Sequence, residues 1–167
     1  MLMLTTSDNT ASLWLQSLAG TGTRINQILD SIGYTATRVN SRTPGREAGR
    51  DKFGWGQTSP KEMATMFEAL ANRNLLDTAS SEKMLRLLGR NYWDEEALSQ
   101  IPPDVFVASK NGAVNASRSE VVYVSGKNAR YVFCICTKNN KDTSWELNNE
   151  GWELARKVSK LLWETYR

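Results

Sequence analysis

The stretch RYVFCICT, residues 130–137, decides the fold class of this chain. In an extended strand, alternate side chains point to opposite faces. The two aromatic residues and the isoleucine therefore share one face, and the valine and both cysteines share the other. A strand that is apolar on both faces has to be covered on both. The sequence therefore predicts a sheet with a covering layer on each side.

Two further strands and a helix surround this stretch. Residues 105–109 and 120–125 are rich in valine and are predicted to be strands, and a Gly126-Lys127-Asn128 turn joins the second of them to 130–137 as a hairpin. Residues 149–166 are predicted to be a helix with an apolar stripe, formed by Trp152, Ala155, Val158, Leu161 and Leu162. We expect an antiparallel three-stranded sheet with this C-terminal helix on one face.

The first two thirds of the chain are predicted to be helices joined by loops, and the change of character falls near Pro102 and Pro103. The predicted helices are residues 10–18, residues 23–32 with Thr23 as cap, a helix from Ser59 to about Ala71 that starts with a capping box, and residues 78–88. Between them, residues 34–58 lose all periodicity, as in a long functional loop. The predicted fold class is α+β, with helices and loops over 1–103 and strands plus a helix over 104–167.

Composition limits the chemistry. The chain has 167 residues, a net charge of +3 and no histidine. Ser-His-Asp and Cys-His hydrolase sites and imidazole metal sites are thereby excluded, so a proton-transfer enzyme built on this chain must use lysine or a carboxylate. The small charge does not indicate a nucleic-acid partner, and no stretch reaches the roughly 18 apolar residues of a membrane helix. We expect no metal and no cofactor.

The two cysteines, Cys134 and Cys136, are both in the third predicted strand. Neighbouring positions on one face of a strand are poorly placed to bridge to each other. Two thiolates without other soft ligands make a poor zinc site. We therefore interpret both cysteines as packing residues.

Two short clusters could carry chemistry. Ser7-Asp8-Asn9 stands immediately before a predicted helix, and Lys110-Asn111-Gly112 stands at the end of a predicted strand. Taken alone, the first is the composition of a helix cap and the second that of a turn. Both of these structural interpretations stay open beside the functional one.

The order of four segments favours the functional interpretation. The segments are Ser7-Asp8-Asn9-Thr10-Ala11, residues 34–40 (YTATRVN), residues 54–64 (GWGQTSPKEMA) and residues 108–115 (ASKNGAVN). In this order they resemble the class A β-lactamase-like serine hydrolases, in the penicillin-binding protein and β-lactamase superfamily. The resemblance implies the later half of the helical lobe at 1–103, with an omega-type loop at about 34–58. The closing strands and C-terminal helix of the α/β lobe would follow at 104–167.

The resemblance also implies roles on the helical side of a cleft. Such enzymes use a serine nucleophile with lysine and carboxylate partners, which suits a chain without histidine. Ser7 would help to carry a proton to the leaving nitrogen. Asn9 would hydrogen-bond the amide side chain of the substrate, and Asp8 would hold the loop.

The strand side of the cleft would carry the rest. Lys110 matches the lysine of the K-T-G motif, which polarises the serine of S-D-N and attracts the substrate carboxylate. Asn111 stands in the position that meets this carboxylate, and Gly112 lets the substrate approach the strand. The backbone N–H of Ala113 would be one oxyanion-hole donor.

Three departures from the family pattern stand against a simple transfer of its activity. Asn111 replaces a hydroxyl residue, and no acid follows Asn40 where class A members place the deacylating glutamate. The S-x-x-K motif of the nucleophile, which precedes S-D-N in the family, is not found before Ser7. The string Ser80-Ser81-Glu82-Lys83 comes after it, and we interpret it as a helix start capped by Thr78 or Ser80.

These observations predict β-lactam amide hydrolysis through an acyl-serine, with the nucleophile segment absent from this chain and the chain inactive alone. One alternative is a non-catalytic remnant or a module that binds penicillin or peptidoglycan. Another is a relative of D-alanyl-D-alanine transpeptidases or esterases. The expected partners are a small β-lactam or peptidoglycan-like substrate and either a second copy of the chain or a complementing N-terminal chain. Family members are typically periplasmic or secreted, but no signal peptide is found in this chain.

Overall fold

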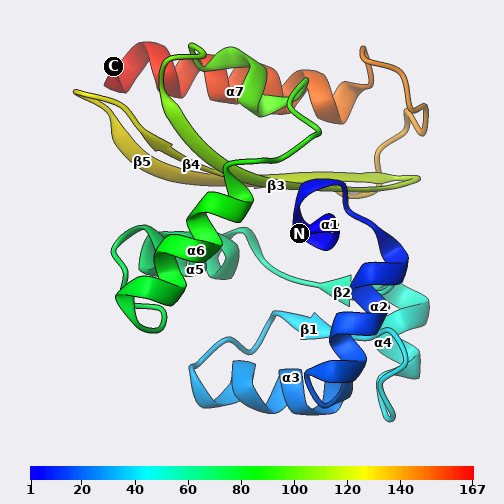
Figure 1. Cartoon of the computed structure of the whole chain (residues 1–167). Helices are drawn as coiled ribbons and strands as arrows, with labels where there is room; N and C mark the ends of the chain where they lie inside the picture. The colour runs from blue at the N-terminus through cyan, green and yellow to red at the C-terminus, as the bar shows by residue number, and fades with distance from the viewer.

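The computed structural model describes residues 1–167, and Figure 1 shows how its elements are arranged. In chain order the elements are α1 (Leu2–Thr5), α2 (Asn9–Leu18), α3 (Thr21–Ser31), β1 (Arg38–Val39), α4 (Glu47–Phe53), β2 (Gly56–Gln57), α5 (Pro60–Ala71), α6 (Thr78–Leu88), the 3-10 helix η1 (Ala97–Gln100), β3 (Phe106–Val114), β4 (Ser117–Ser125), β5 (Arg130–Cys136) and α7 (Glu150–Tyr166).

Most of the longer helices begin at a capping side chain. The caps of α2, α5, α6 and α7 each accept a backbone N–H of the first turn; they are Asp8, Ser59, Asp77 and Asn149. The predictions of Thr23, Thr78 and Ser80 as caps are wrong. Helix α3 begins at Thr21 after a left-handed Gly20, so Thr23 lies inside its first turn. Asp77 takes the capping position in α6 because its carboxylate accepts the N–H of Ser80 at 2.8 Å.

The predicted three-stranded antiparallel sheet is confirmed, with the strand order β3-β4-β5. Strand β3 is longer than predicted and continues to Val114, because Lys110, Asn111 and Gly112 pair with Val121, Glu120 and Ser119 of β4. The interpretation of Lys110-Asn111-Gly112 as a turn is therefore wrong. These three residues stay in the strand in spite of their turn-forming composition, because β4 offers backbone hydrogen-bond partners along the whole length of β3.

The sheet is covered on both faces, as its apolar pattern predicted. In Figure 1, α7 lies above the sheet and α5 and α6 lie below it. The core below the sheet holds Phe67, Leu70, Ala71, Leu85, Leu88, Ala108, Val121 and Tyr123. The core above it holds Ala97, Ile101, Val122, Val124, Trp152 and Ala155. Residues 121–124 thus alternate between the two cores, which confirms the α+β fold class. The division into parts at 1–103 and 104–167 stays a prediction.

One position of the predicted stripe on α7 is wrong. Leu161 is 64% exposed, whereas Trp152, Ala155 and Ser159 are buried. The buried face therefore follows residues three and four apart from Trp152 to Ser159, a serine whose Oγ donates to the carbonyl of Ala97 at 2.6 Å. Leu161 follows Trp152 by about two and a half helical turns, so it lies on the opposite side of α7 from the buried face.

The long loop at 34–58 is an ordered structure rather than a loop throughout. Strands β1 and β2 pair antiparallel and close it, and α4 forms inside it, which the sequence did not predict. The carboxylate of Glu62 in α5 accepts the backbone N–H groups of Thr35, Ala36 and Thr37 at 2.8, 2.8 and 2.7 Å. The predicted capping box is therefore half formed. Ser59 Oγ accepts the backbone N–H of Glu62, but the Glu62 carboxylate binds the loop instead of the backbone N–H of Ser59.

The pKa of Glu62 reflects these contacts. Partial desolvation opposes its ionisation, but the hydrogen bonds from Ala36 and Thr37, followed by the one from Thr35, hold the pKa of this carboxyl below its ordinary value. The charged form of Glu62 therefore stabilises the loop at neutral pH.

The two cysteines differ in their surroundings. Cys134 is half-buried and packs against the core below the sheet, as predicted. Cys136 is exposed, so the packing interpretation is wrong for this residue. It is the last residue of β5 and lines a cavity between the sheet and the loop at 34–58.

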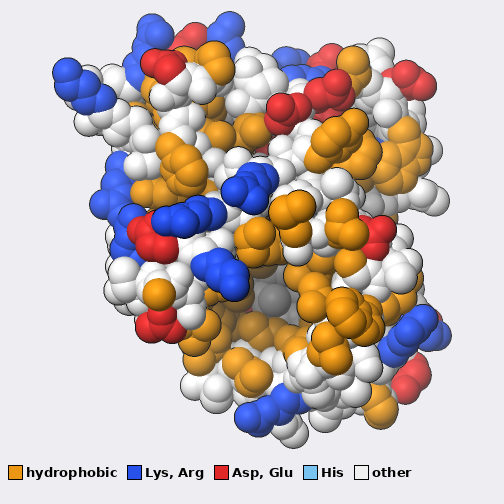
Figure 2. Space-filling model, viewed as in Figure 1, with side chains coloured by type: hydrophobic (Ala, Val, Ile, Leu, Met, Phe, Trp, Pro, Cys, Tyr) orange, Lys and Arg blue, Asp and Glu red, His pale blue; other side chains and the backbone are white.

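The structure leaves several surfaces uncovered. The outer edges of β3 and β5 have no strand neighbour. Figure 2 shows a hollow below the sheet with hydrophobic side chains around it.

None of the helices is long and apolar enough to cross a membrane.

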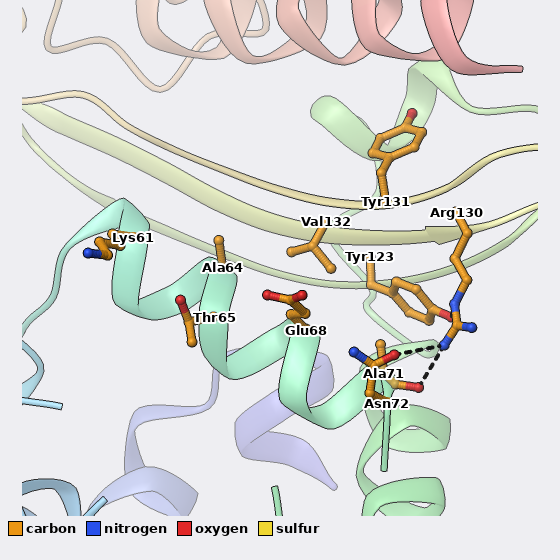
Figure 3. A pocket seen from close by; sticks show the side chains of 10 residues that line it. All are labelled: Lys61, Ala64, Thr65, Glu68, Ala71, Asn72, Tyr123, Arg130, Tyr131 and Val132. Atoms are coloured by element: carbon orange, nitrogen blue, oxygen red, sulfur yellow. Dashed lines mark hydrogen bonds between the residues drawn. The ribbon is translucent and has the colours of Figure 1, made fainter. Parts of the chain in front are cut away.

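A cavity of about 520 Å³ lies between α5 and the sheet (Figure 3). Its charged lining residues are Lys61, Glu68 and Arg130. The Arg130 guanidinium donates to the carbonyl of Ala71 at 3.1 Å and to the side-chain oxygen of Asn72 at 3.3 Å. None of the predicted site residues lines this cavity.

Candidate functional site

The Ser7-Asp8-Asn9 cluster forms the turn between α1 and α2. Ser7 has a left-handed backbone conformation, with φ of 56°, which is uncommon for a residue with a side chain and clusters at functional sites. The Asp8 carboxylate accepts the N–H of Ala11 at 2.6 Å and caps α2. Asn9 is the exposed first residue of this helix. The turn therefore presents Ser7 while Asp8 fixes the loop.

The lysine of β3 reaches this turn from a position remote in the sequence. The Lys110 ammonium donates a hydrogen bond to Ser7 Oγ. It also donates to the carbonyl of Asn111 at 2.6 Å and lies 3.4 Å from the side-chain oxygen of Asn111. All three partners are neutral oxygens, and no carboxylate pairs directly with this ammonium.

The pKa of Lys110 is lowered from its ordinary value. Burial is the larger cause, because it disfavours the charged form, and the attraction of Glu120 acts in the opposite direction. A lysine with a lowered pKa exchanges a proton more readily with a neighbouring hydroxyl than an exposed lysine does. Ser7 and Lys110 thus form a pair that can move a proton.

A cavity of about 350 Å³ opens beside this pair. It is lined by Ser7, Asn111, Gly112 and Ala113 together with three tryptophans, Trp93, Trp145 and Trp152. The structure therefore brings five of the predicted site residues together, since Lys110 contacts Ser7. Asp8 and Asn9 do not line this cavity. Gly112 is close to its neighbour strand: a Cβ atom there would stand 3.1 Å from Ser119 Oγ.

Three contacts from residues 91–93 hold the turn against β3, and the sequence analysis missed them. The Asn91 amide donates to Ser109 Oγ at 2.9 Å, and the Trp93 indole N–H donates to the carbonyl of Thr6 at 3.2 Å. The backbone N–H of Tyr92 donates to the carbonyl of Thr5 at 2.8 Å. No local pattern signals these contacts, because each joins segments far apart in the sequence.

A buried carboxyl group lies on the strand next to Asn111. Glu120 is opposite Asn111 in the sheet and is 1% exposed. One of its oxygens accepts the N–H of Ala97 at 2.9 Å, and the other has no hydrogen-bond partner. Burial raises the pKa of Glu120 to about 7, with Glu96 adding to the effect and Lys110 opposing it. The sequence analysis missed this residue, which stands at an inward position of a valine-rich strand.

The tip of the β3–β4 hairpin is fixed by a buried arginine. The guanidinium of Arg118 donates to the carbonyls of Val114, Ser117 and Ser144. It also lies over the ring of Trp145, 4.7 Å from the ring centroid. Arg118 thus joins the hairpin to the segment before α7 and positions one tryptophan of the cavity.

Another cavity, of about 850 Å³, lies between the sheet and the loop at 34–58. Gly112 and Ala113 line it as well, and Cys136 and residues of the loop complete it. None of its 18 lining residues is an aspartate or glutamate. The missing loop glutamate is therefore not replaced by another acid in this cavity.

The Ser7–Lys110 pair can transfer a proton, and the cavity beside it is also lined by Glu95 and Glu96. No group of three or more histidine, cysteine, aspartate or glutamate side chains is placed to hold a metal ion. The Ser80-to-Lys83 string lies in the first turns of α6, where Ser80 Oγ donates to the capping Asp77 and Ser81 is fully buried. Ser80 thus serves the start of α6, and Ser81 is enclosed with no hydrogen-bond partner for its Oγ.

Likeness to known proteins shows the family and the fold. The model of the beta-lactamase enzyme family matches residues 1–166. The structure of PBP-A superposes with a TM-score of 0.82 at 24% identity over 98% of this chain. A mutant of the chromosome-encoded β-lactamase of Vibrio parahaemolyticus gives 0.76 at 26% identity over 99% of this chain, and an ancestral class A β-lactamase gives 0.77 at 23% over 99%. The chain covers 58%, 63% and 63% of those three chains. No curated protein matches.

Proposed function

The chain belongs to the beta-lactamase enzyme family, and from this premise we propose that it forms the Ser7–Lys110 wall of a β-lactam-binding serine hydrolase site. The observation that carries the proposal is the hydrogen bond from Lys110 to Ser7 Oγ. A cleft wall of this kind acts on a β-lactam amide or on a peptide of related shape.

The proposed roles follow from the donors and acceptors. Because Ser7 Oγ accepts from Lys110, its own hydroxyl proton is free to pass to a leaving nitrogen, and Lys110 can then restore it. The Lys110 charge and the Asn111 amide attract the substrate carboxylate. The N–H of Ala113 donates to the oxyanion. Asn9 meets the amide side chain of the substrate from the exposed start of α2.

The acyl-forming serine would come from outside these 167 residues. A nitrocefin assay on the purified chain is expected to give hydrolysis equal to buffer, because Ser7 is a proton carrier in this account and not a nucleophile. A longer protein, with a serine and a lysine three residues apart ahead of this chain, is expected to form an acyl adduct. Hydrolysis by the chain itself that Ser7→Ala abolishes would contradict this assignment.

One observation favours the alternatives of a binding module or a transpeptidase or esterase relative. The cavity beside the loop has no acidic lining residue to activate a deacylating water. An acyl-enzyme formed here would therefore be long-lived. The lifetime of the adduct in the longer protein separates these functions: rapid turnover supports a β-lactamase, and a persistent adduct supports a penicillin-binding role.

The open sheet edges support a partner chain. The outer edge of β5 is unpaired, and large apolar side chains such as Leu154 and Leu161 are exposed on α7. We expect the isolated chain to self-associate or to bind a complementing N-terminal chain. Light scattering after size-exclusion chromatography measures this, and a monodisperse monomer at high concentration would contradict it.

A further inference from the structure

The cysteine pair of β5 forms a cluster that the proposed function does not use. Cys134 and Cys136 lie two residues apart on one face of the strand, and their sulfur atoms are 3.9 Å from each other. Both thiols are free, and Cys136 is exposed. Because Cys136 is exposed and lines the cavity beside the loop, a small reagent reaches this thiol first, and the sulfur of Cys134 lies next to it.

The strand geometry prevents these thiols from bridging to each other. Alternate residues of a strand are about 6.6 Å apart along the chain, so the two Cβ atoms stand far apart even though the sulfur atoms turn toward each other. A disulfide requires Cβ atoms about 3.5–4.5 Å apart, so closing it would distort β5. Pairing of β5 with β4 from Ser119 to Ser125 holds the strand extended and opposes that distortion. The two sulfur atoms therefore stay in contact as thiols.

The same distance suits a shared third atom. Two sulfur ligands about 2.3 Å from a shared atom can lie no more than about 4.6 Å apart, so sulfur atoms 3.9 Å apart are within reach of one common centre. Soft sulfur ligands select soft, thiophilic centres. Because no third histidine, cysteine or carboxylate completes a cluster here, the site suits a centre that needs only two protein sulfurs.

We propose that Cys134 and Cys136 form a two-thiol chelating site for trivalent arsenic compounds of the type that carries one organic group. Two As–S bonds form, the arsenic–oxygen bonds of the arsenoxide break, and the two thiol protons leave with that oxygen as water. No electron is transferred. The bound group occupies the face of the sheet that Gly112, Ser119 and Cys136 share as one ladder row.

Phenylarsine oxide is the probe, and intact-protein mass spectrometry of the 167-residue chain is the measurement. We expect one arsenical for each chain, retained in excess 2-mercaptoethanol and removed by 2,3-dimercaptopropanol. A chelate holds its ligand at least about 100-fold more tightly than one thiol does, because the second bond forms within the molecule.

The decisive variant is Cys136→Ser, since Cys136 is exposed and its replacement leaves the core intact. It should lose the adduct in 2-mercaptoethanol, whereas Ser119→Ala, which changes the neighbouring side chain and keeps both thiols, should retain it. Circular dichroism checks the fold of each variant. Absence of a wild-type adduct in 2-mercaptoethanol, or its retention in Cys136→Ser, would overturn the proposal.

Discussion

Glu120→Gln is expected to stabilise the protein at pH 8 by about 3 kcal/mol and to leave its stability nearly unchanged at pH 4.5. The native pKa of Glu120 is about 7, against an ordinary value of 4.5. When the pKa of a carboxyl is higher in the folded than in the unfolded protein, the protonated form of that carboxyl stabilises the fold relative to the charged form. Ionisation therefore costs stability progressively as pH rises from about 4.5 to about 7, and this cost is constant above that range.

The amide suits the site because it keeps an acceptor for the Ala97 N–H and never ionises. Urea denaturation of wild type and variant at several pH values measures the difference, and using the difference cancels the carboxyls whose pKa is lowered, such as Glu62. Glu164→Gln makes the same substitution at an exposed position of α7 and controls for the change of side chain itself. A Glu120→Gln variant that is less stable than wild type at pH 8 would contradict the buried, raised-pKa carboxyl.

Lys110→Met is expected to weaken binding of benzylpenicillin to the chain by about 10- to 100-fold, the effect of losing a hydrogen bond to a charged group. Methionine keeps the length and apolar stem of the side chain but removes the ammonium that donates to Ser7 Oγ and that we propose to hold the substrate carboxylate. Nuclear magnetic resonance titration gives the two dissociation constants.

Lys127→Met is the matched control, since Lys127 is an exposed lysine in the turn between β4 and β5. It should bind benzylpenicillin as the wild type does. Equal affinities of the wild type and Lys110→Met would exclude the carboxylate role of Lys110.

The parts of the fold that depend on neighbours in sequence could be predicted. The capped starts of α2 and α5 follow from local side chains, and the two-sided burial of β5 follows from its alternation. The end of β3 could not be predicted in this way. Lys110, Asn111 and Gly112 have turn composition, and only the partners in β4 keep them in the strand.

The same distinction applies to the site. The meeting of Ser7 with Lys110 was expected only through the resemblance of four ordered segments, because no local pattern joins residues so far apart. The contacts of Asn91 and Trp93 and the burial of Glu120 depend on tertiary packing and left no signal in the sequence. Cys136 was assigned to the core from the burial habit of cysteine, yet the structure leaves it exposed at the end of β5.

The most direct measurement follows the backbone amides of the uniformly labelled wild-type chain while benzylpenicillin is added. If Ser7 and Lys110 form the wall of one β-lactam site, the largest shifts should fall on Ser7 and on residues 110–113, from both sides of the cavity at a single dissociation constant. Shifts confined to the cavity between α5 and β5, or an unperturbed spectrum at saturating ligand, would contradict that claim.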